Sequence, residues 1–213
     1  MSLGGFGTQA RRKLLFVMAA EVEYGPALRQ RIQPVITGVG PVEAAIRTAM
    51  ALQALQSAGE LPDLVVSLGS AGSRTLEQGA VYQVASVSWR DMDASALGFA
   101  KGVTPFLDHP VEIPLPTPIA GLKAARLSTG AAVVSGLAYG GIDADMVDME
   151  TFAVLRACQT FGVPMIGLRG ISDGAEELRH YNDWASVLPV IDRRLAEAID
   201  ALEATLRENP VAI

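Results

Sequence analysis

Residues 63–72 read Asp-Leu-Val-Val-Ser-Leu-Gly-Ser-Ala-Gly, an apolar run that ends in a glycine-rich segment. A short continuous apolar run is typical of a strand buried on both faces. Similar runs occur elsewhere in the chain, at residues 14–18, 34–37 and 164–171. Stretches with helical periodicity alternate with these runs, at residues 20–31, 42–57, 149–161 and 184–207. This alternation predicts an α/β fold, a three-layer α/β/α arrangement with a central mixed, mainly parallel sheet.

The middle of the chain has a different pattern. Residues 81–89 alternate between apolar and polar side chains and predict a strand, and residues 132–135 predict another. Between them, residues 90–118 are rich in proline and show no helical period, so we expect a long loop there. A loop of this length is usually functional or part of an interface.

Length and composition leave small molecules and other protein chains as the expected partners. A chain of 213 residues fits one domain with a substantial core, predicted to span residues 13–207 between a flexible N-terminal tail at 1–12 and a C-terminal tail at 208–213. A net charge of −6 argues against a nucleic-acid partner, which would need clustered basic side chains. No apolar run reaches the ~20 residues of a membrane span.

Cysteine and histidine usage bears on metals and on location. Cys158 is the single cysteine, so an intrachain disulfide and a CxxC metal cage are excluded. His109 and His180 lie far apart in sequence, which argues against a histidine metal site. We therefore expect no metal and no cofactor, and a reducing, cytoplasmic location.

Three carboxylates follow predicted strands or begin a helix. Ligands of open α/β sheets bind beyond the carboxyl ends of the strands, which makes Glu21, Glu150 and Asp173 candidates for chemistry. Each also has a simpler interpretation: acids are favoured in the first turn of a helix, and Asp-Gly is a common turn pair. Gly69–Gly72 is either a tight turn or a place where backbone N–H groups approach an oxygen-rich ligand.

The order and wording of five segments closely resemble the purine nucleoside phosphorylase superfamily, and among its members the 5′-methylthioadenosine/S-adenosylhomocysteine nucleosidases. These segments are Met-Ala-Ala-Glu-Val at 18–22, Gly-Val-Gly-Pro-Val at 38–42, Gly-Ser-Ala-Gly at 69–72, Val-Asp-Met-Glu at 147–150 and Ile-Ser-Asp at 171–173. The resemblance covers roughly residues 13–206 and implies hydrolysis of the N-glycosidic bond of a purine nucleoside.

The resemblance also implies roles for individual residues. Asp173 would protonate the purine at N7, while Glu21 would activate the attacking water, in the manner of a two-carboxylate glycosidase. Tyr139 would stack on the purine and Glu150 would accept hydrogen bonds from the ribose hydroxyls. The remaining substrate contacts implied in this way are Met18, Ser70, Ala71, Gly72, Gly140, Met149, Arg169 and Ser172. Tyr181 and Trp184 either flank the 5′ group or simply pack the terminal helix.

Two further expectations concern the co-substrate and the assembly. Ser67 stands where the phosphorylases of the superfamily carry a phosphate-binding arginine, which favours water over phosphate. A phosphate-dependent phosphorylase, or a nucleosidase for another 5′-modified adenosine, remains the alternative. The segment 90–99 is similar to a loop of these nucleosidases, and by resemblance we expect a homodimer in which the loop at 91–106 lends apolar residues to the neighbouring pocket.

Overall fold

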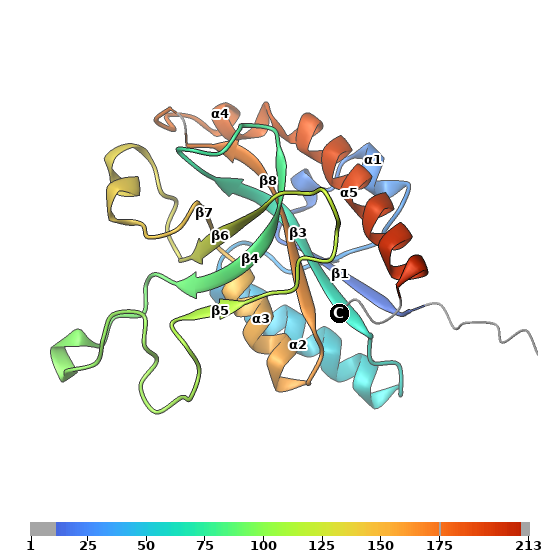
Figure 1. Ribbon diagram of the computed structural model, residues 1–213, viewed down its shortest axis with the longest axis horizontal. Helices are drawn as coiled ribbons and strands as arrows, with labels where there is room; N and C mark the ends of the chain where they lie inside the picture. The colour runs from blue at the N-terminus through green and yellow to red at the C-terminus, as the bar shows by residue number, and fades with distance from the viewer. Residues whose placement is uncertain (1–11, 175, 210–213) are drawn as a thin grey trace, which may run out of the picture.

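The computed structural model describes residues 12–174 and 176–209 (Figure 1). The predicted N-terminal tail lies outside the described residues except for Arg12, and the predicted C-terminal tail lies outside them beyond Asn209. In the part of the chain that is described, no helix is long and apolar enough to cross a membrane.

All the strands in the described residues belong to one sheet. They are β1 (Leu14–Met18), β2 (Val35–Ile36), β3 (Leu64–Gly72), β4 (Val81–Trp89), β5 (Glu112–Pro114), β6 (Ala124–Thr129), β7 (Met146–Asp148) and β8 (Met165–Asp173). Their order is β2-β1-β3-β7-β6-β4-β5, and β8 pairs with both β3 and β4. Strands β3, β7, β6, β4 and β8 therefore close into a ring (Figure 1).

This closure changes the predicted architecture. The α/β class and the mixed character of the sheet are confirmed, but an open, mainly parallel sheet between two helical layers is not. Antiparallel pairing occurs three times, between β3 and β7, β4 and β5, and β4 and β8. A strand that pairs on both of its edges leaves no mark in its own hydrophobic pattern, so apolar runs could not reveal the barrel.

Helices pack against two separate apolar clusters of the barrel. The α-helices are α1 (Pro26–Arg29), α2 (Pro41–Ser57), α3 (Thr151–Thr160), α4 (Tyr181–Ala185) and α5 (Leu188–Glu208). The 3₁₀ helices are η1 (Glu21–Glu23), η2 (Ser95–Leu97) and η3 (Gly136–Gly141). Helices α2 and α3 lie together on one side of the strands, whereas α1 and α5 lie on another (Figure 1).

Several element boundaries differ from those predicted. A continuous helix at 20–31 is wrong, because η1 and α1 are separate there and Tyr24 and Gly25 have extended or irregular backbone between them. Residues 132–135 do not form a strand, and β5, β6 and β7 were not predicted. Gly69–Gly72 is not a tight turn: these residues continue β3 and pair with β8.

Candidate active site

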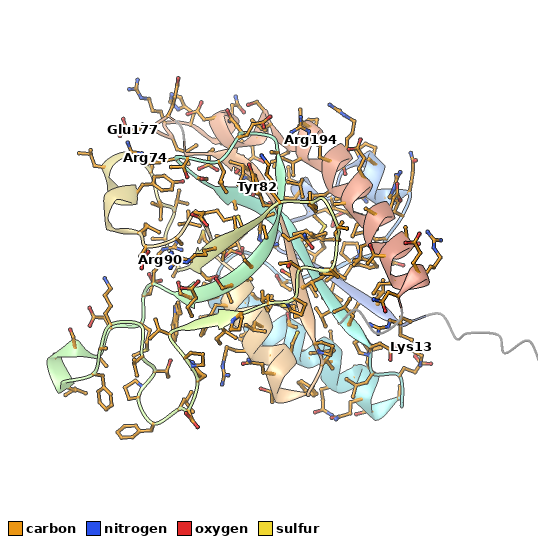
Figure 2. The ribbon with its side chains drawn as sticks, in the orientation of Figure 1. Lys13, Arg74, Tyr82, Arg90, Glu177 and Arg194 are labelled. Carbon is orange, nitrogen blue, oxygen red and sulfur yellow. The ribbon has the colours of Figure 1, made fainter. Side chains whose placement is uncertain are left out.

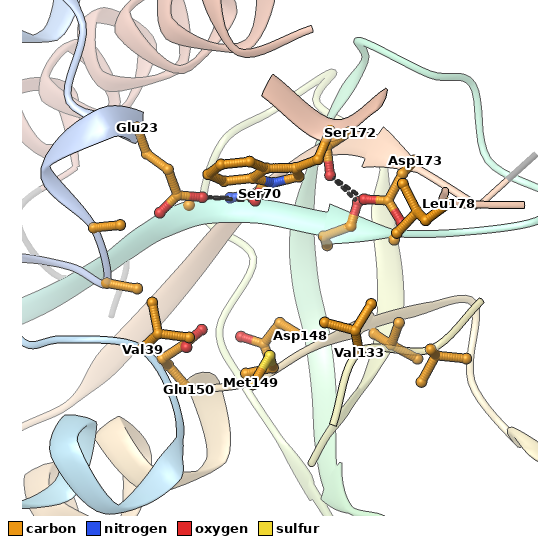
Figure 3. Close-up of a pocket in the computed structure, with 18 of the residues that line it drawn as sticks. Glu23, Val39, Ser70, Val133, Asp148, Met149, Glu150, Ser172, Asp173 and Leu178 are labelled. Atoms are coloured by element: carbon orange, nitrogen blue, oxygen red, sulfur yellow. Dashed lines mark hydrogen bonds between the residues drawn. The ribbon is translucent and has the colours of Figure 1, made fainter. Parts of the chain in front are cut away.

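A cavity of about 460 Å³ opens where β1, β3, β7 and β8 end. Glu23, Ser70, Ser172 and Asp173 lie along one side of it, and Val39, Met149, Glu150 and Val133 lie along the other (Figure 3). Most of the exposed lining is apolar, with the polar side chains gathered at a few points. Such a cavity suits a small, mainly aromatic ligand that a few polar groups orient.

Asp173 is the last residue of β8 and faces the cavity. The pairing of β3 with β8 shifts between Ala71 and Gly72, which brings Gly72 level with Asp173. The Ser172 hydroxyl donates a hydrogen bond to Oδ1 of Asp173, at 2.5 Å (Figure 3). Burial raises the pKa of the Asp173 carboxyl despite this hydrogen bond. A raised pKa suits a group that must deliver a proton near neutral pH.

Of the two glutamates in η1, Glu23 lines this cavity and Glu21 does not. Glu23 is 7% exposed. Its carboxylate accepts hydrogen bonds from the Ser70 backbone N–H, at 2.8 Å, and from the Ser70 hydroxyl, at 2.6 Å (Figure 3). The Glu21 side chain is 62% exposed and pairs with Arg29 at the surface. The predicted placement of Glu21 is therefore wrong. With about three residues per turn in η1, side chains two positions apart point in different directions.

Glu150 precedes α3 and lies across the cavity from Glu23 (Figure 3). It accepts a hydrogen bond from the backbone N–H of Gly40, at 2.8 Å. Burial, with a contribution from the nearby Asp148 charge, raises the pKa of Glu150 to about 7. Met149, the preceding residue, also lines the cavity. The predicted pair Met149 and Glu150 is thus placed where a bound ligand would meet it.

Arg169 lies beneath the cavity and does not line it. Its guanidinium pairs with Asp148, at 3.0 Å, and donates to the Ser67 hydroxyl, at 3.0 Å, and to the Thr151 hydroxyl, at 2.6 Å. A Cβ added to Gly69 would lie 3.5 Å from Oε2 of Glu23 and 3.9 Å from Cζ of Arg169. Arg169 is therefore close to the Glu23 carboxylate, but its donors already serve protein acceptors.

Three other predicted contacts lie outside the cavity lining. Tyr139 in η3 is buried with Val134 and Val147, and its hydroxyl faces Gly72 and Asp173 from behind. Met18 is buried in the core, and Gly140 is exposed on η3. The structure brings together seven of the twelve predicted site residues as cavity lining: Ser70, Ala71, Gly72, Met149, Glu150, Ser172 and Asp173.

The remaining lining includes residues that the sequence did not identify. Arg90, labelled in Figure 2, follows β4 and donates to the backbone carbonyls of Ser128, Asp148 and Ala132, which fixes the segment that carries Val133. Trp184 lines the cavity and also packs with the α5 cluster. For Glu23, the only available signal was a second acid near the end of β1.

Comparison with known proteins shows the family of this chain. The family model described as the phosphorylase superfamily matches residues 19–206. The chain belongs to the phosphorylase superfamily. Among curated members, it is 31% identical over 188 residues to the 5′-methylthioadenosine/S-adenosylhomocysteine nucleosidase of Actinobacillus succinogenes, covering 80% of this chain and 79% of the relative. It is 26% identical over 216 residues to the nucleosidase of the same name from Glaesserella parasuis, covering 92% and 90%.

Solved structures of this superfamily share the fold. The chain is similar to the 5′-methylthioadenosine/S-adenosylhomocysteine nucleosidase of Colwellia psychrerythraea in complex with adenine, with a TM-score of 0.77 at 20% identity, covering 92% of this chain and 96% of that one. A futalosine hydrolase mutant of Helicobacter pylori gives a TM-score of 0.71 at 20% identity, with coverage of 92% and 99%. The phosphorylase-superfamily fold thus extends over nearly the whole chain.

Proposed function

We propose that this protein is a nucleosidase that hydrolyses the N-glycosidic bond of 5′-methylthioadenosine, S-adenosylhomocysteine or both, giving adenine and the 5′-modified ribose. The observation that carries the proposal is the arrangement of two carboxyl groups, the buried Glu23 and the half-buried Asp173, in one cavity. The curated relatives at up to 31% identity are named as nucleosidases of this kind.

The two carboxyl groups match the demands of the reaction. Cleavage of the bond leaves negative charge on the purine and positive charge on the ribose, so an acid must protonate the base and a base must deprotonate water. Asp173, whose pKa is raised by burial, supplies the proton at N7. Glu23 replaces Glu21 as the group that takes a proton from water. One of its oxygens, Oε1, accepts both Ser70 hydrogen bonds.

Glu150 is the group that holds the sugar. It stands across the cavity from Glu23 and next to Met149, so a ribose between them would place its hydroxyls at Glu150 and its apolar face at Met149. Ala71 and Gly72 line the floor between the two carboxyl groups, where a small side chain or none lets a flat ligand approach the strand.

Water is favoured over phosphate as the co-substrate. Ser67 is buried in β3 and accepts hydrogen bonds from Arg169 through its carbonyl and hydroxyl oxygens. The Arg169 charge is already balanced by Asp148. An anion beside Glu23 would meet a buried carboxylate, and the nearby Arg169 is already paired with Asp148, so we expect a hydrolase and not a phosphorylase.

We further propose a cytoplasmic homodimer. Exposed apolar side chains recur along α2 at Val42, Ile46 and Met50, in register with one face of the helix. Phe106 and Leu97, in the loop predicted to reach a neighbouring pocket, are 96% and 78% exposed. Sedimentation of the purified protein should give twice the chain mass, whereas a monomer would refute the dimer.

The decisive experiment is a substrate panel with and without phosphate. The purified protein is incubated with methylthioadenosine, S-adenosylhomocysteine, adenosine, inosine and further 5′-modified adenosines. Release of adenine and free 5′-modified ribose at a rate independent of phosphate is expected. A phosphate requirement with a ribose 1-phosphate product would establish the phosphorylase instead. No base release from any nucleoside would remove the proposed function.

A further inference from the structure

Trp184 reaches the proposed catalytic base through one intervening hydroxyl. Its indole Nε1–H donates a hydrogen bond to Oγ of Ser70, at 2.9 Å. The same Oγ donates to Oε1 of Glu23, at 2.6 Å. Trp184 lies on α4, Ser70 on β3 and Glu23 on η1, so three segments distant in sequence meet in one chain of hydrogen bonds.

The direction of these bonds follows from the chemistry of the groups. An indole N–H can only donate, so the Ser70 oxygen must act as acceptor toward Trp184. A serine hydroxyl carries a single hydrogen, and with Trp184 occupying a lone pair that hydrogen points to Glu23. The Ser70 backbone N–H donates to the same oxygen, Oε1. Oε2 of Glu23 accepts no hydrogen bond from the described residues and is left for the attacking water.

We propose that Trp184 is a positioning residue that fixes the Ser70 hydroxyl as a donor to Glu23, and thereby holds the Glu23 carboxylate oriented for proton abstraction. The proposal rests on the proposed function, since it assigns the role of an indole N–H toward the base of that reaction. It differs from contact with the 5′ group, which would use the indole ring face and would need no N–H.

Other charged groups near Glu23 stay constant in the test. Arg169 approaches Gly69 from the same side as Glu23. Glu150 faces Glu23 across the cavity, with Asp148 near Glu150. Arg179 and His180 line the cavity on the segment before α4. None of them hydrogen-bonds to the Trp184 indole. A change in pH dependence that follows loss of the N–H alone can therefore be traced to the Ser70 bridge.

The experiment compares Trp184→Phe, which keeps an aromatic ring and removes the donor, with the wild type. We expect kcat to fall on the order of tenfold with KM within about twofold, because a hydrogen bond that serves a charged group is weakened. The acidic limb of the kcat/KM profile should move to higher pH, since the ionised form of Glu23 loses part of its support. The Trp89→Phe variant is the matched control, because Trp89 lies outside the cavity lining and its Nε1 is buried without a partner in the described residues.

A double-mutant cycle separates this role from packing. In a Ser70→Ala background, Trp184→Phe should cost no further activity, because the bridge is already gone. Additive losses, an unchanged pH profile, or a rise in KM at constant kcat would overturn the proposal and leave the nucleosidase assignment intact.

Thermal unfolding of each variant shows whether it folds. If Trp184→Phe fails to fold it is replaced by Trp184→Leu, which also has no donor and should show the same kcat loss and limb shift. A wild type without nucleosidase activity overturns both proposals.

Discussion

Arg169 and Asp148 form an ion pair directly beneath the cavity, with 3.0 Å between Nη2 and Oδ2 and with both side chains 2% exposed or less. Asp148 also accepts hydrogen bonds from the Thr129 hydroxyl and from the Thr151 backbone N–H, so it joins β6, β7 and the start of α3. The pair thus supports the segment that presents Met149 and Glu150. The ion pair therefore positions Met149 and Glu150 and takes no direct part in the proposed reaction.

Asp148→Asn should destabilise the protein by roughly 3–5 kcal/mol, because the buried Arg169 guanidinium then lacks a counter-charge. Urea unfolding of the variant and the wild type measures the difference. The matched control is Glu112→Gln in the surface pair with Arg126, whose side chains are 36% and 42% exposed. That change should cost at most about 1 kcal/mol. Equal losses in the two variants would contradict the structural role given to Asp148.

The two glutamates of η1 offer a direct test of the base. Glu23→Gln should lower kcat by roughly 10²–10⁴-fold, because the amide cannot take a proton from water. Glu21→Gln should leave kcat nearly unchanged, since the Glu21 side chain is largely exposed and pairs with Arg29 at the surface. Steady-state kinetics on methylthioadenosine separates the two variants. A larger loss at Glu21 would return the catalytic role to that residue.

The acid assignment is tested by Asp173→Asn. The amide has no proton to deliver at N7, so we expect a comparable loss of turnover, while an inhibitor that already carries a proton or a donor at that position should still bind. Calorimetry with such an inhibitor and a turnover assay give the two readings. Unchanged turnover would show that another group protonates the base.

Gly72 and Tyr139 should be coupled. A Cβ on Gly72 would lie 2.2 Å from the Tyr139 hydroxyl oxygen and 2.9 Å from Oδ2 of Asp173. Gly72→Ala should therefore cost about 1–3 kcal/mol of stability. The loss should be smaller in a Tyr139→Phe background, where the nearest of these atoms is absent. Additive costs in urea unfolding would mean that the tyrosine hydroxyl does not limit this site.

Glu150 should make stability depend on pH. Its pKa in the folded protein is about 7, above the ordinary value of 4.5, so the native state binds an extra proton between those values. Stability from this group is therefore present below pH 4.5 and is lost as pH rises through 7. Glu150→Gln keeps an acceptor for Gly40 and cannot ionise. Between pH 5 and 8 its melting temperature should fall less than that of the wild type. Parallel curves would refute the raised pKa.

The sequence predicted the site better at strand ends than in the segments that leave them. Asp173 is the last residue of β8, and it lines the cavity, as expected for a residue at the carboxyl end of a strand. Glu21 and Glu23 both follow β1, and which one turns inward depends on the path of η1, which the break at Gly25 sets. Gly25 in turn packs against Asp192 of α5, a contact between residues 167 positions apart in sequence.

The same limit applies to Tyr139 and to the barrel. Tyr139 of η3 packs behind the cavity wall against Val134 and Val147. These two partners come from other segments of the chain, so the sequence around Tyr139 does not reveal the contact. The β7 strand has three residues, and it enters the ring through its pairing with β6 on one side and β3 on the other. Local periodicity carries no information about partners so distant along the chain.

Closing the ring also determines how this molecule can meet another copy of itself. Among the described strands, the sheet ends only at β2, with two residues, and at β5, with three. Backbone N–H and C=O groups available for strand addition are correspondingly few. The proposed dimer is therefore expected to form through side-chain surfaces, which favours a defined stoichiometry over open-ended fibre growth.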